Sequence, residues 1–368
     1  MGFKCGILGL SNVGKSTLFN ALTATAAAQA SSYPFSTIEP NVGEVMVPDP
    51  RLDVLAKLAS SAKIKPTRLT FVDIAGLVSG ASRGEGLGNQ FLAHIREVDA
   101  VAHVVRCFED SEIAHVSGRI DPIADIDTIE TELMLADLDS LERRVDALEK
   151  KAKGSDKDAK EARETLDLVN RALVLLREGK PARFTERKPE EEKTFHALGL
   201  LTSMPVLYVC NVDEAAAATG NEFSRVVEQR AQAEGAGCVV ISAKIEAEIA
   251  VLSRAERADY LSAVGLAEPG LDRLIRAGYE LLHLVTYFTA GPKEARAWTV
   301  TRGTKAPQAA GVIHTDFERG FIRAETIAYD DYVSLGGEAG ARDGGKLRLE
   351  GKDYVVSDGD VMHFRFAT

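Results

Sequence analysis

The feature that most constrains this 368-residue chain is the segment GLSNVGKS at residues 9–16. It fits the pattern GxxxxGK followed by Ser or Thr, and it lies between FKCGILG, typical of a buried strand, and GKSTLFNALTA, typical of a helix. In that setting the glycines let backbone N–H groups surround phosphates, and the helix N-terminus adds a favourable dipole. Lys15 supplies a positive charge for the β- and γ-phosphates, and Ser16 is expected to ligate Mg²⁺. The sequence therefore predicts a P-loop domain that binds a nucleoside triphosphate.

Two further segments are typical of proteins whose shape follows the bound nucleotide. Asp73 and Gly76 belong to DIAG, where the carboxylate can hold Mg²⁺ through water and the Gly76 N–H can reach a γ-phosphate. Thr37 lies in the Pro-bounded segment PFSTIEPN, and a threonine there completes the Mg²⁺ shell only while the γ-phosphate is present. An ordinary surface turn is the alternative for this segment. The favoured prediction is a loop that is ordered by the triphosphate and released on hydrolysis.

The residue after Gly76 is Leu77, at a position where many GTPases have a glutamine that orients water. A leucine cannot hydrogen-bond, so either another polar group acts or intrinsic turnover is low. Two residues are candidate catalytic groups, Lys15 and His115. His115 is proposed because a neutral imidazole can accept a proton. An ordinary loop histidine is the equal alternative. Asn12 is a candidate for assisting a monovalent cation, K⁺, near the phosphates.

The base specificity is predicted from two segments, NVDE at residues 211–214 and SAK at 242–244. GTPases of this fold usually carry NKxD, whose aspartate accepts from two guanine donors. Here Glu214 is one methylene longer and Val212 replaces the lysine, and an unpaired buried donor costs about 1–3 kcal/mol. Asn211 can still pair with N6 and N7 of adenine, because an amide both donates and accepts. ATP is therefore expected over GTP, with Ser242 and Ala243 lining the same site.

The remaining pattern predicts an α/β, doubly wound P-loop domain over residues 1–282 and a small α+β domain over 283–366. Short apolar strands alternate with helical stretches, except in a region of heptad-like spacing around residues 127–195. That region predicts an antiparallel helical hairpin, turning near Gly154-Ser155-Asp156 and inserted in the first domain. Apolar residues recur every three or four positions along its first helix at Met134, Leu138, Leu141, Val145 and Leu148.

Charge and hydropathy narrow the possible partners. A net charge of −11 argues against indiscriminate nucleic-acid binding, so we expect no DNA partner, and any RNA contact needs a local basic patch. The segment RRVDALEKKAK, at residues 143–153, is better explained as a solvated helix face than as such a patch. No apolar run reaches the roughly 18 residues of a membrane helix. We therefore expect a cytoplasmic protein without a membrane partner.

Taken together, GLSNVGKS, YPFSTIEPNVGE, DIAGLV, NVDE and SAK resemble the YchF/Obg-like ATPases over essentially the full length. The C-terminal segments TYFTAG, APQAAGVIHTDFERGFIRAE and DGDVMHFRF resemble their TGS domain, a ubiquitin-like β-grasp module. The resemblance implies an Obg-type domain followed by a TGS domain, and a ribosome-associated ATPase of the translation-factor class. It implies the large ribosomal subunit as the docking surface, with rRNA or tRNA contact. Ser11 departs from the family's usual proline, and Val212 from its usual Met or Leu.

The same resemblance assigns site residues by position. The metal roles fall on Ser16 and Thr37, and Val212 lies beside the base through its backbone. The nucleotide roles fall on Asn12, Val13, Gly14, Lys15, Ser16 and Thr17.

Three functions remain open at this point. The first is a slow, Mg²⁺-dependent ATPase whose turnover drives a molecular switch. The second is a translation factor that hydrolyses GTP. The third is a nucleotide-gated module that binds ribosomes or RNA, in which hydrolysis only resets the bound state.

Overall fold

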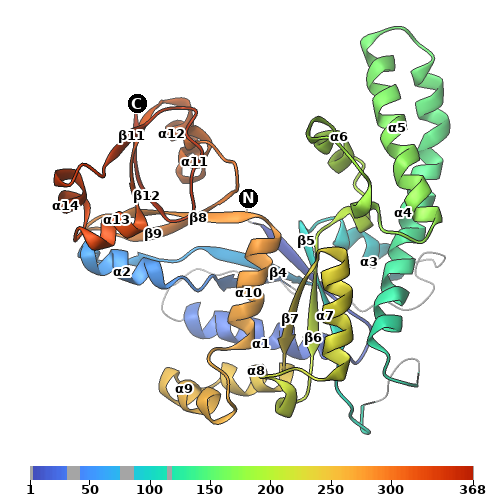
Figure 1. The fold of residues 1–368 in the computed structure, drawn as a ribbon, viewed down its shortest axis with the longest axis horizontal. Coiled ribbons are helices and arrows are strands. Elements are labelled where there is room, and N and C mark those ends of the chain that lie inside the picture. The colour runs from blue at the N-terminus through green and yellow to red at the C-terminus, as the bar shows by residue number, and fades with distance from the viewer. Residues whose placement is uncertain (1–2, 31–41, 75–86, 114–117, 368) are drawn as a thin grey trace. The chain divides into compact units, whose positions relative to one another are not determined.

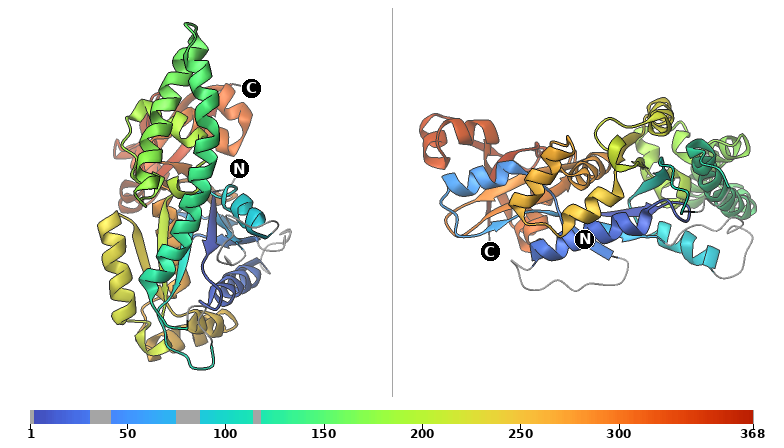
Figure 2. Two further views of the ribbon diagram at one scale, coloured as in Figure 1. Left: turned by 90° about the vertical axis from the view of Figure 1, so that its right-hand side faces the viewer. Right: turned by 90° about the horizontal axis from the view of Figure 1, so that it is seen from below.

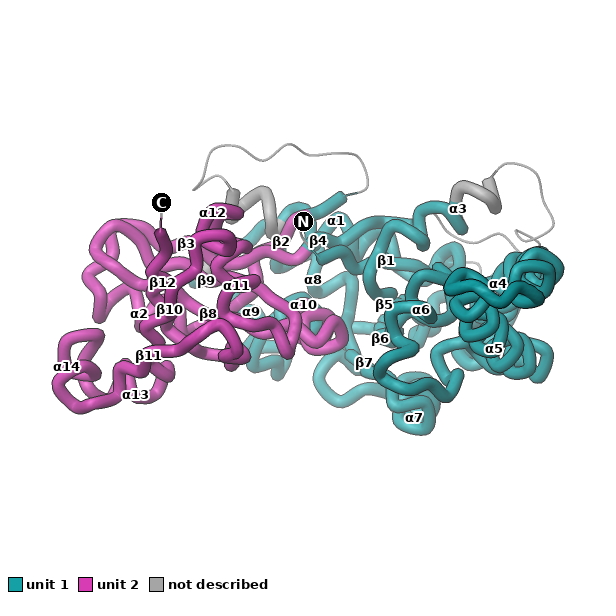
Figure 3. The backbone as a smooth tube through the Cα atoms, turned by 90° about the horizontal axis from the view of Figure 1, so that it is seen from above, with its two compact units in different colours: residues 1, 3–43, 70–274 teal, residues 2, 44–69, 275–368 magenta. Residues whose placement is uncertain are grey.

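The computed structural model describes residues 3–30, 42–74, 87–113 and 118–367, and the chain forms two compact units (Figure 3). The first unit comprises residues 3–43 and 70–274. The second comprises residues 44–69 and 275–368. Within the described residues, no helix is both long and apolar enough to span a membrane.

A six-stranded sheet forms the centre of the first unit (Figure 1). Strand β1 pairs in parallel with β4 and β5, and parallel pairing continues from β5 to β6 and β7. All residues of β5 are buried, as expected for a strand covered on both faces. In spatial order the strands are β2 (Val42–Met46), β4 (Arg68–Asp73), β1 (Lys4–Leu8), β5 (Ala100–Arg106), β6 (Val206–Asn211) and β7 (Gly237–Ile241).

Helices cover both faces of this sheet, which confirms the predicted doubly wound α/β fold. Figure 2 shows α7 and α1 on opposite sides of the strands. Because side chains alternate along a strand, Tyr208 and Cys210 of β6 lie on the same face, where they pack with Val227 and Ala231 of α7. The helices are α1 (Lys15–Ala30), α3 (Leu87–Ile95), α7 (Glu222–Glu234), α8 (Ala243–Ala250), α9 (Arg254–Ala263) and α10 (Gly270–Leu281).

The predicted hairpin is present as α4 (Pro122–Ala152) and α5 (Lys157–Arg177) (Figure 1). Helix α4 begins before the expected residue 127, because Asp121 caps it by accepting from Ala124 N at 3.1 Å and Pro122 suits a first helical position. Asp156 caps α5 in the same way. The apolar seam between the helices includes Leu141, Leu168, Val169, Leu173 and Leu176. Short helical segments follow at η1 (Ala182–Phe184), η2 (Pro189–Glu191), α6 (Glu192–Ala197) and η3 (Leu201–Ser203).

The second unit contains a mixed six-stranded sheet with the β-grasp arrangement expected from the sequence. Strands β8 and β9 form a hairpin, helix α11 (Ala306–Ile313) follows, and the last strand, β12, lies parallel to β8. Helix α11 packs on one face with Tyr287 and Phe364. In spatial order the strands are β11 (Arg348–Glu350), β10 (Phe321–Ala328), β12 (Asp360–Phe366), β8 (Leu284–Ala290), β9 (Ala295–Thr301) and β3 (Ile64–Lys65).

The second unit differs from the expected boundary at residue 283, because it recruits residues 44–69. Helix α2 (Pro50–Leu58) buries Leu52 and Leu55 against Phe288 on the face of the sheet opposite α11. Its Arg51 donates to Asp358 at 2.6 Å. Helices α12 (Thr315–Arg319), α13 (Tyr329–Ser334) and α14 (Glu338–Asp343) complete the described elements of this unit.

Candidate nucleotide site

The loop between β1 and α1 has the backbone shape that the P-loop pattern predicts. Gly14 has a φ of +89°, and a Cβ at this position would overlap Asn211 Nδ2. Asn12 also adopts a left-handed conformation, with a φ of +64°. The sequence Asn-Val-Gly therefore supplies residues that tolerate this tight turn, and Gly14 lets the loop approach β6 closely.

The N-terminus of α1 is suited to bind an anion. The helix begins at Lys15, it has no acidic residue in its first turn, and Ser16 and Thr17 are exposed. Backbone N–H groups and the helix dipole both favour negative charge at such an end. The structure thus places the predicted phosphate-binding residues Asn12, Val13, Gly14, Lys15, Ser16 and Thr17 on one continuous loop and helix start.

Lys15 and Asp73 form an ion pair beside this loop. Parallel pairing of β1 with β4 brings the carboxyl ends of the two strands together, and Asp73 is the last residue of β4. The Lys15 side chain is 9% exposed and that of Asp73 is 16% exposed. The group predicted to bind phosphate therefore lies against the group predicted to hold Mg²⁺, and each neutralises the other.

Asn211 connects the P-loop to the loop that contains Ser242 and Ala243. Its Nδ2 donates to Val13 O at 2.9 Å, and its Oδ1 accepts from Ala243 N at 2.9 Å. The side chain is buried at the end of β6. The pairing of Asn211 with adenine stays a prediction, but the structure gives the amide a bridging role that sequence reasoning missed. The signal was only an asparagine at a strand end, which does not reveal its distant partners.

A hydrogen bond and an ion pair join the two segments expected to contact the base, residues 211–214 and residues 241–244. Val212 is buried, and its N–H donates to Ile241 O at 2.9 Å. Glu214 is paired with Lys244, and the hydrogen bond from that ammonium group lowers the pKa of Glu214. Ser242 is 2% exposed, and its hydroxyl has no hydrogen-bond partner among the described residues. We call residues 242–244 the base loop from here on.

Three predicted site residues, Thr37, Gly76 and His115, lie outside the described part of the chain, as does Leu77. Their metal-binding, phosphate-binding and catalytic roles stay predictions. The site that the structure does describe therefore consists of the P-loop, Asp73, Asn211 and the base loop.

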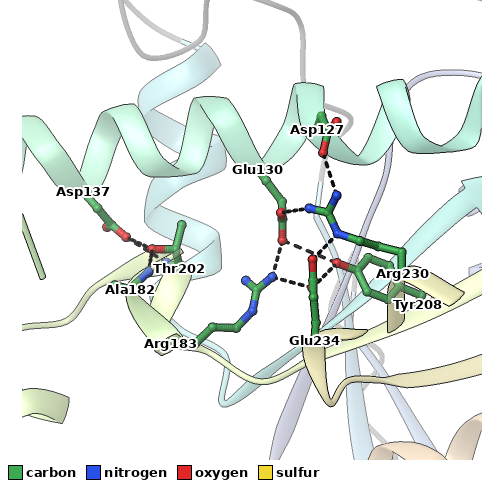
Figure 4. A network of polar contacts seen from close by, with 9 residues as sticks. All are labelled: Asp127, Glu130, Asp137, Ala182, Arg183, Thr202, Tyr208, Arg230 and Glu234. Carbon is green, nitrogen blue, oxygen red and sulfur yellow. Dashed lines mark hydrogen bonds and ion pairs between the residues drawn. The ribbon is translucent and has the colours of Figure 1, made fainter. Parts of the chain in front are cut away.

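A buried network of charged groups, which the sequence did not predict, joins the hairpin to the sheet (Figure 4). Arg183, just after the hairpin, bridges Glu130 of α4 and Glu234 of α7, with 3.0 Å to Glu234. Tyr208 of β6 donates to Glu234 at 2.9 Å, and burial raises the Tyr208 pKa. Arg230 contacts both carboxylates from α7. Every buried charge in this network thus has an opposite charge beside it, as burial requires.

A groove on the hairpin carries an excess of positive charge. It has a volume of about 610 Å³ and lies between α4, α5 and α6. Four basic side chains and one acidic side chain line it: Arg143, Arg144, Lys151, Lys193 and Glu161. Within the described chain, neither Lys151 nor Lys193 is paired with a carboxylate. The fold thus brings Lys193 of α6 beside the segment 143–153, a juxtaposition that helix periodicity did not indicate.

Family models match both parts of the chain. Residues 4–136 match a model described as a 50S ribosome-binding GTPase. Residues 284–367 match the model of the C-terminal domain of YchF GTPases, described as a protein of unknown function (DUF933). The two matches fall on the P-loop region and on the β8–β12 sheet.

Full-length similarity extends over the whole chain. A protein of Haemophilus ducreyi named ribosome-binding ATPase YchF is 57% identical over 366 residues, covering 100% of this chain and 99% of that protein. The Bacillus subtilis protein of the same name is 55% identical over 368 residues, covering 100% of both. The solved structure of a Schizosaccharomyces pombe protein named YchF GTPase superposes with a TM-score of 0.89 at 36% identity, covering 99% of this chain and 98% of that one.

Proposed function

Because the chain belongs to the YchF family, we propose that it is a ribosome-binding ATPase that acts as a translation-factor-class switch. The P-loop and the family membership make it a nucleotide hydrolase of the P-loop class. The observation that carries the choice of ATP is Glu214, held by Lys244 at the position where a guanine-reading aspartate would stand. The lengthened and paired carboxylate opposes guanine, whose two donors would lose a well-placed acceptor.

The base loop offers groups that suit adenine. Outside this loop, the N6 amino group of adenine needs an acceptor, which the amide oxygen of Asn211 or the backbone carbonyl of Val212 can supply. The Ser242 hydroxyl, which has no hydrogen-bond partner in the described part of the chain, can both donate and accept, so it suits a ring nitrogen. The relative from Schizosaccharomyces pombe is named a GTPase, so GTP hydrolysis is the alternative to test.

The test is titration of the whole chain with ATP and with GTP, followed by phosphate release with each nucleotide. We expect ATP to bind at least several-fold more tightly and to be the better substrate. Tighter binding of GTP would overturn the adenine assignment. The titration is repeated with ribosomes present, because a bound ribosome can favour one nucleotide state.

Mg²⁺ is the expected cofactor, and the described residues fit it. Ser16 presents a hydroxyl and Asp73 a carboxylate that would hold the ion through water, both oxygen groups of the kind that Mg²⁺ prefers, and Thr37 is the other expected ligand. When bound, the ion neutralises charge on the β- and γ-phosphates. Lys15 would then pair with the phosphates instead of with Asp73. K⁺ beside Asn12 is the expected second ion.

Hydrolysis is expected to be slow. Leu77 gives no side-chain hydrogen bond to an attacking water, so His115 is the proposed water-orienting group. Turnover should lie well below the roughly 1–100 s⁻¹ of kinases. His115→Ala should lower turnover while leaving ATP affinity nearly unchanged, and wild-type turnover would remove His115 from the mechanism.

The ribosome is the proposed partner, because the relatives carry that function in their names. The large subunit is the expected site, consistent with the matched model for 50S-binding GTPases, and the cytoplasm is the expected compartment. ATP-bound protein should cosediment with ribosomes more strongly than ADP-bound protein. Equal sedimentation in both states would contradict the switch. Equal strength with a non-hydrolysable analogue and with ATP would favour the nucleotide-gated binding module, in which hydrolysis is only a reset.

The hairpin groove is the proposed rRNA contact. Lys151 and Lys193 of the groove, which pair with no carboxylate among the described residues, can each neutralise an RNA phosphate and release a counterion. Replacing both by Gln should lower the slope of log affinity against log salt by about 1.4–1.8, which amounts to about 25- to 60-fold weaker ribosome binding at ~0.1 M salt if the affinities are equal at ~1 M. The matched control replaces Lys153 and Lys157, exposed lysines of the same hairpin that do not line the groove. Equal loss in both variants would contradict a specific groove contact.

A further inference from the structure

A buried carboxylate, that of Glu246, follows the base loop in helix α8. Glu246 is 1% exposed on the first turns of α8, the helix that begins with Ala243. Its side chain accepts from Gly270 N at 2.7 Å and from Leu271 N at 3.3 Å. Its own N–H donates to Ser242 O at 3.0 Å, which is the first backbone bond of α8, so the helix itself links Glu246 to the base loop. Glu246 is therefore bonded to the base loop through its backbone and to the start of α10 through its side chain.

The contact between α8 and α10 depends on close approach. A Cβ at Gly270 would lie 2.9 Å from Glu246 Oε1 and 2.6 Å from Ile241 Cγ1. Ile241 is the last residue of β7 and immediately precedes Ser242. The start of α10 thus contacts the chain on both sides of the base loop. Any larger residue at position 270 would separate these elements.

The carboxylate fills a position that a capping side chain normally occupies. The first N–H groups of a helix lack partners within it, and an acceptor at that end stabilises the helix. Here the acceptor comes from a neighbouring helix instead of from the residue before the helix. Removing it would leave two buried N–H groups without an acceptor, so the contact strongly favours one arrangement of α8 and α10.

The contact continues to the phosphate end of the site. Ala243 N donates to Asn211, and Asn211 donates to Val13 of the P-loop. Glu246, the base loop, Asn211 and the P-loop therefore form one connected set of hydrogen bonds. In the other direction, α10 starts in the first unit and ends at Leu281 in the second, so the helix that Glu246 caps leads the chain out of the nucleotide domain.

We propose that Glu246 is a positioning residue for nucleotide binding, which holds the base loop in register with the start of α10. The role rests on the proposed ATPase function, and it adds a residue that does not touch the nucleotide. A shift of α10 would move the base loop through Glu246. Nucleotide binding at the base loop would move α10 by the same route, because coupling between two sites is reciprocal.

The protonation of Glu246 provides a test of this role, because a residue with a purely structural role would not make ATP affinity change with pH. Burial raises its pKa to about 7, against the lowering effect of the two backbone N–H groups. On α10, Asp272 raises this pKa and Arg273 lowers it. Above about pH 7 the carboxylate accepts both N–H bonds with full charge, and charged acceptors make the stronger bonds. The coupling should therefore be tighter at about pH 8 than at about pH 6.

The experiment measures the affinity of the full chain for a fluorescent ATP analogue at about pH 6 and about pH 8. Glu246→Gln keeps the shape but mimics the protonated acid. We expect it to bind roughly threefold to tenfold more weakly than wild type at the higher pH and to match wild type at the lower. Any change in the protonation of the ATP analogue between the two pH values affects both proteins equally, so it cancels when their affinities are compared.

Asp137→Asn is the matched control. Asp137 is also a buried carboxylate, and it accepts from Leu201 N and Thr202 N at 2.8 Å, but in the hairpin (Figure 4). It should lose stability like Glu246→Gln while its ATP affinity stays within about twofold of wild type. An equal loss of affinity in both variants would overturn the positioning role. So would wild-type affinity of Glu246→Gln at both pH values.

A second variant approaches the contact from the other side. Gly270→Ala displaces α10 from Glu246, so it should weaken ATP binding as Glu246→Gln does, and the two changes together should cost less than the sum of each alone. Additive losses would show that the two residues act separately and would overturn the proposal. Failure of wild type to bind ATP would instead contradict the proposed function itself, which separates the two failures.

Discussion

Replacing Asn211 by alanine tests the bridge between the P-loop and the base loop. The change removes the donor to Val13 O and the acceptor of Ala243 N, both at 2.9 Å. Asn211 is 5% exposed, so water cannot readily replace the amide. A buried polar group left unsatisfied costs about 1–3 kcal/mol, and two such groups give about 2–6 kcal/mol. That is a large part of the roughly 5–15 kcal/mol by which a typical domain is stable.

The loss should appear in two assays. Urea unfolding should show the loss of stability as a lower midpoint. Titration with ATP should show affinity reduced roughly tenfold or more, because the phosphate loop and the base loop are no longer held at a fixed separation. The affinity is measured in native buffer, once the urea curve has shown that the variant is folded there.

Asn221→Ala is the control for this prediction. The Asn221 amide also makes two bonds, accepting from Ser224 N at 3.0 Å and donating to Cys107 O at 2.7 Å, but it caps α7. It should lower stability to a similar degree and leave ATP affinity nearly unchanged. If Asn211→Ala loses stability but binds ATP as tightly as wild type, the bridge has no function in binding. If it loses no stability, the hydrogen-bond energies assigned to the bridge are wrong.

Four further perturbations test other parts of the structure. Lys15→Ala should weaken ATP binding about 10- to 100-fold, as loss of a charged hydrogen bond to phosphate predicts, and unchanged affinity in a folded variant would remove the P-loop assignment. Glu214→Asp should narrow the preference for ATP over GTP measured by titration, and a wider preference would contradict the proposed role of the longer carboxylate. Burial lowers the pKa of the His103 imidazole to about 3, below its ordinary value of 6.5. The free energy of unfolding that the neutral imidazole contributes is therefore complete above about pH 6.5, and it is lost by about 1.4 kcal/mol per pH unit as the pH falls. His103→Phe should therefore flatten the decline of the urea midpoint between about pH 6.5 and 4, and an unchanged decline would exclude this histidine as its cause. Arg183→Met leaves Glu130 and Glu234 short of a buried partner and should cost about 3–5 kcal/mol in urea unfolding, whereas a loss below ~1 kcal/mol would show that Arg230 suffices.

Local chemistry in the sequence was enough to predict much of the fold. The P-loop between β1 and α1, the buried strands and the α4–α5 hairpin each follow from a pattern within a few turns or one strand. Such patterns are reliable because apolar periodicity and capping residues act on neighbours along the chain. Helix α4 begins earlier than expected because Asp121 and Pro122 form its N-cap and first helical position, a signal that is also local to the sequence.

The boundary between the units could not be predicted in the same way. Leu52 and Leu55 show that α2 has an apolar face, but not what covers it. In the structure Phe288 covers that face, so deleting the chain from His283 onward would also expose Leu52 and Leu55. A lysine at position 212, as in NKxD, would place a charge in the buried cluster that Val212 shares with Val227 and Ala231 of α7. Glu214→Asp alone is therefore the substitution that tests the choice of base.

The sequence by itself determined the chemistry available to this protein: a phosphate loop at residues 9–16, Asp73 beyond it, and Glu214 where a guanine-reading aspartate would be. Only the tertiary structure decided how those groups are held. It paired Lys15 with Asp73, made Asn211 a bridge, and placed Glu246 under the start of α10. The physical reason is that a motif fixes which atoms a segment can offer, whereas the partners of a buried polar group come from chain segments far away in sequence, and only the packed fold brings them within hydrogen-bonding distance.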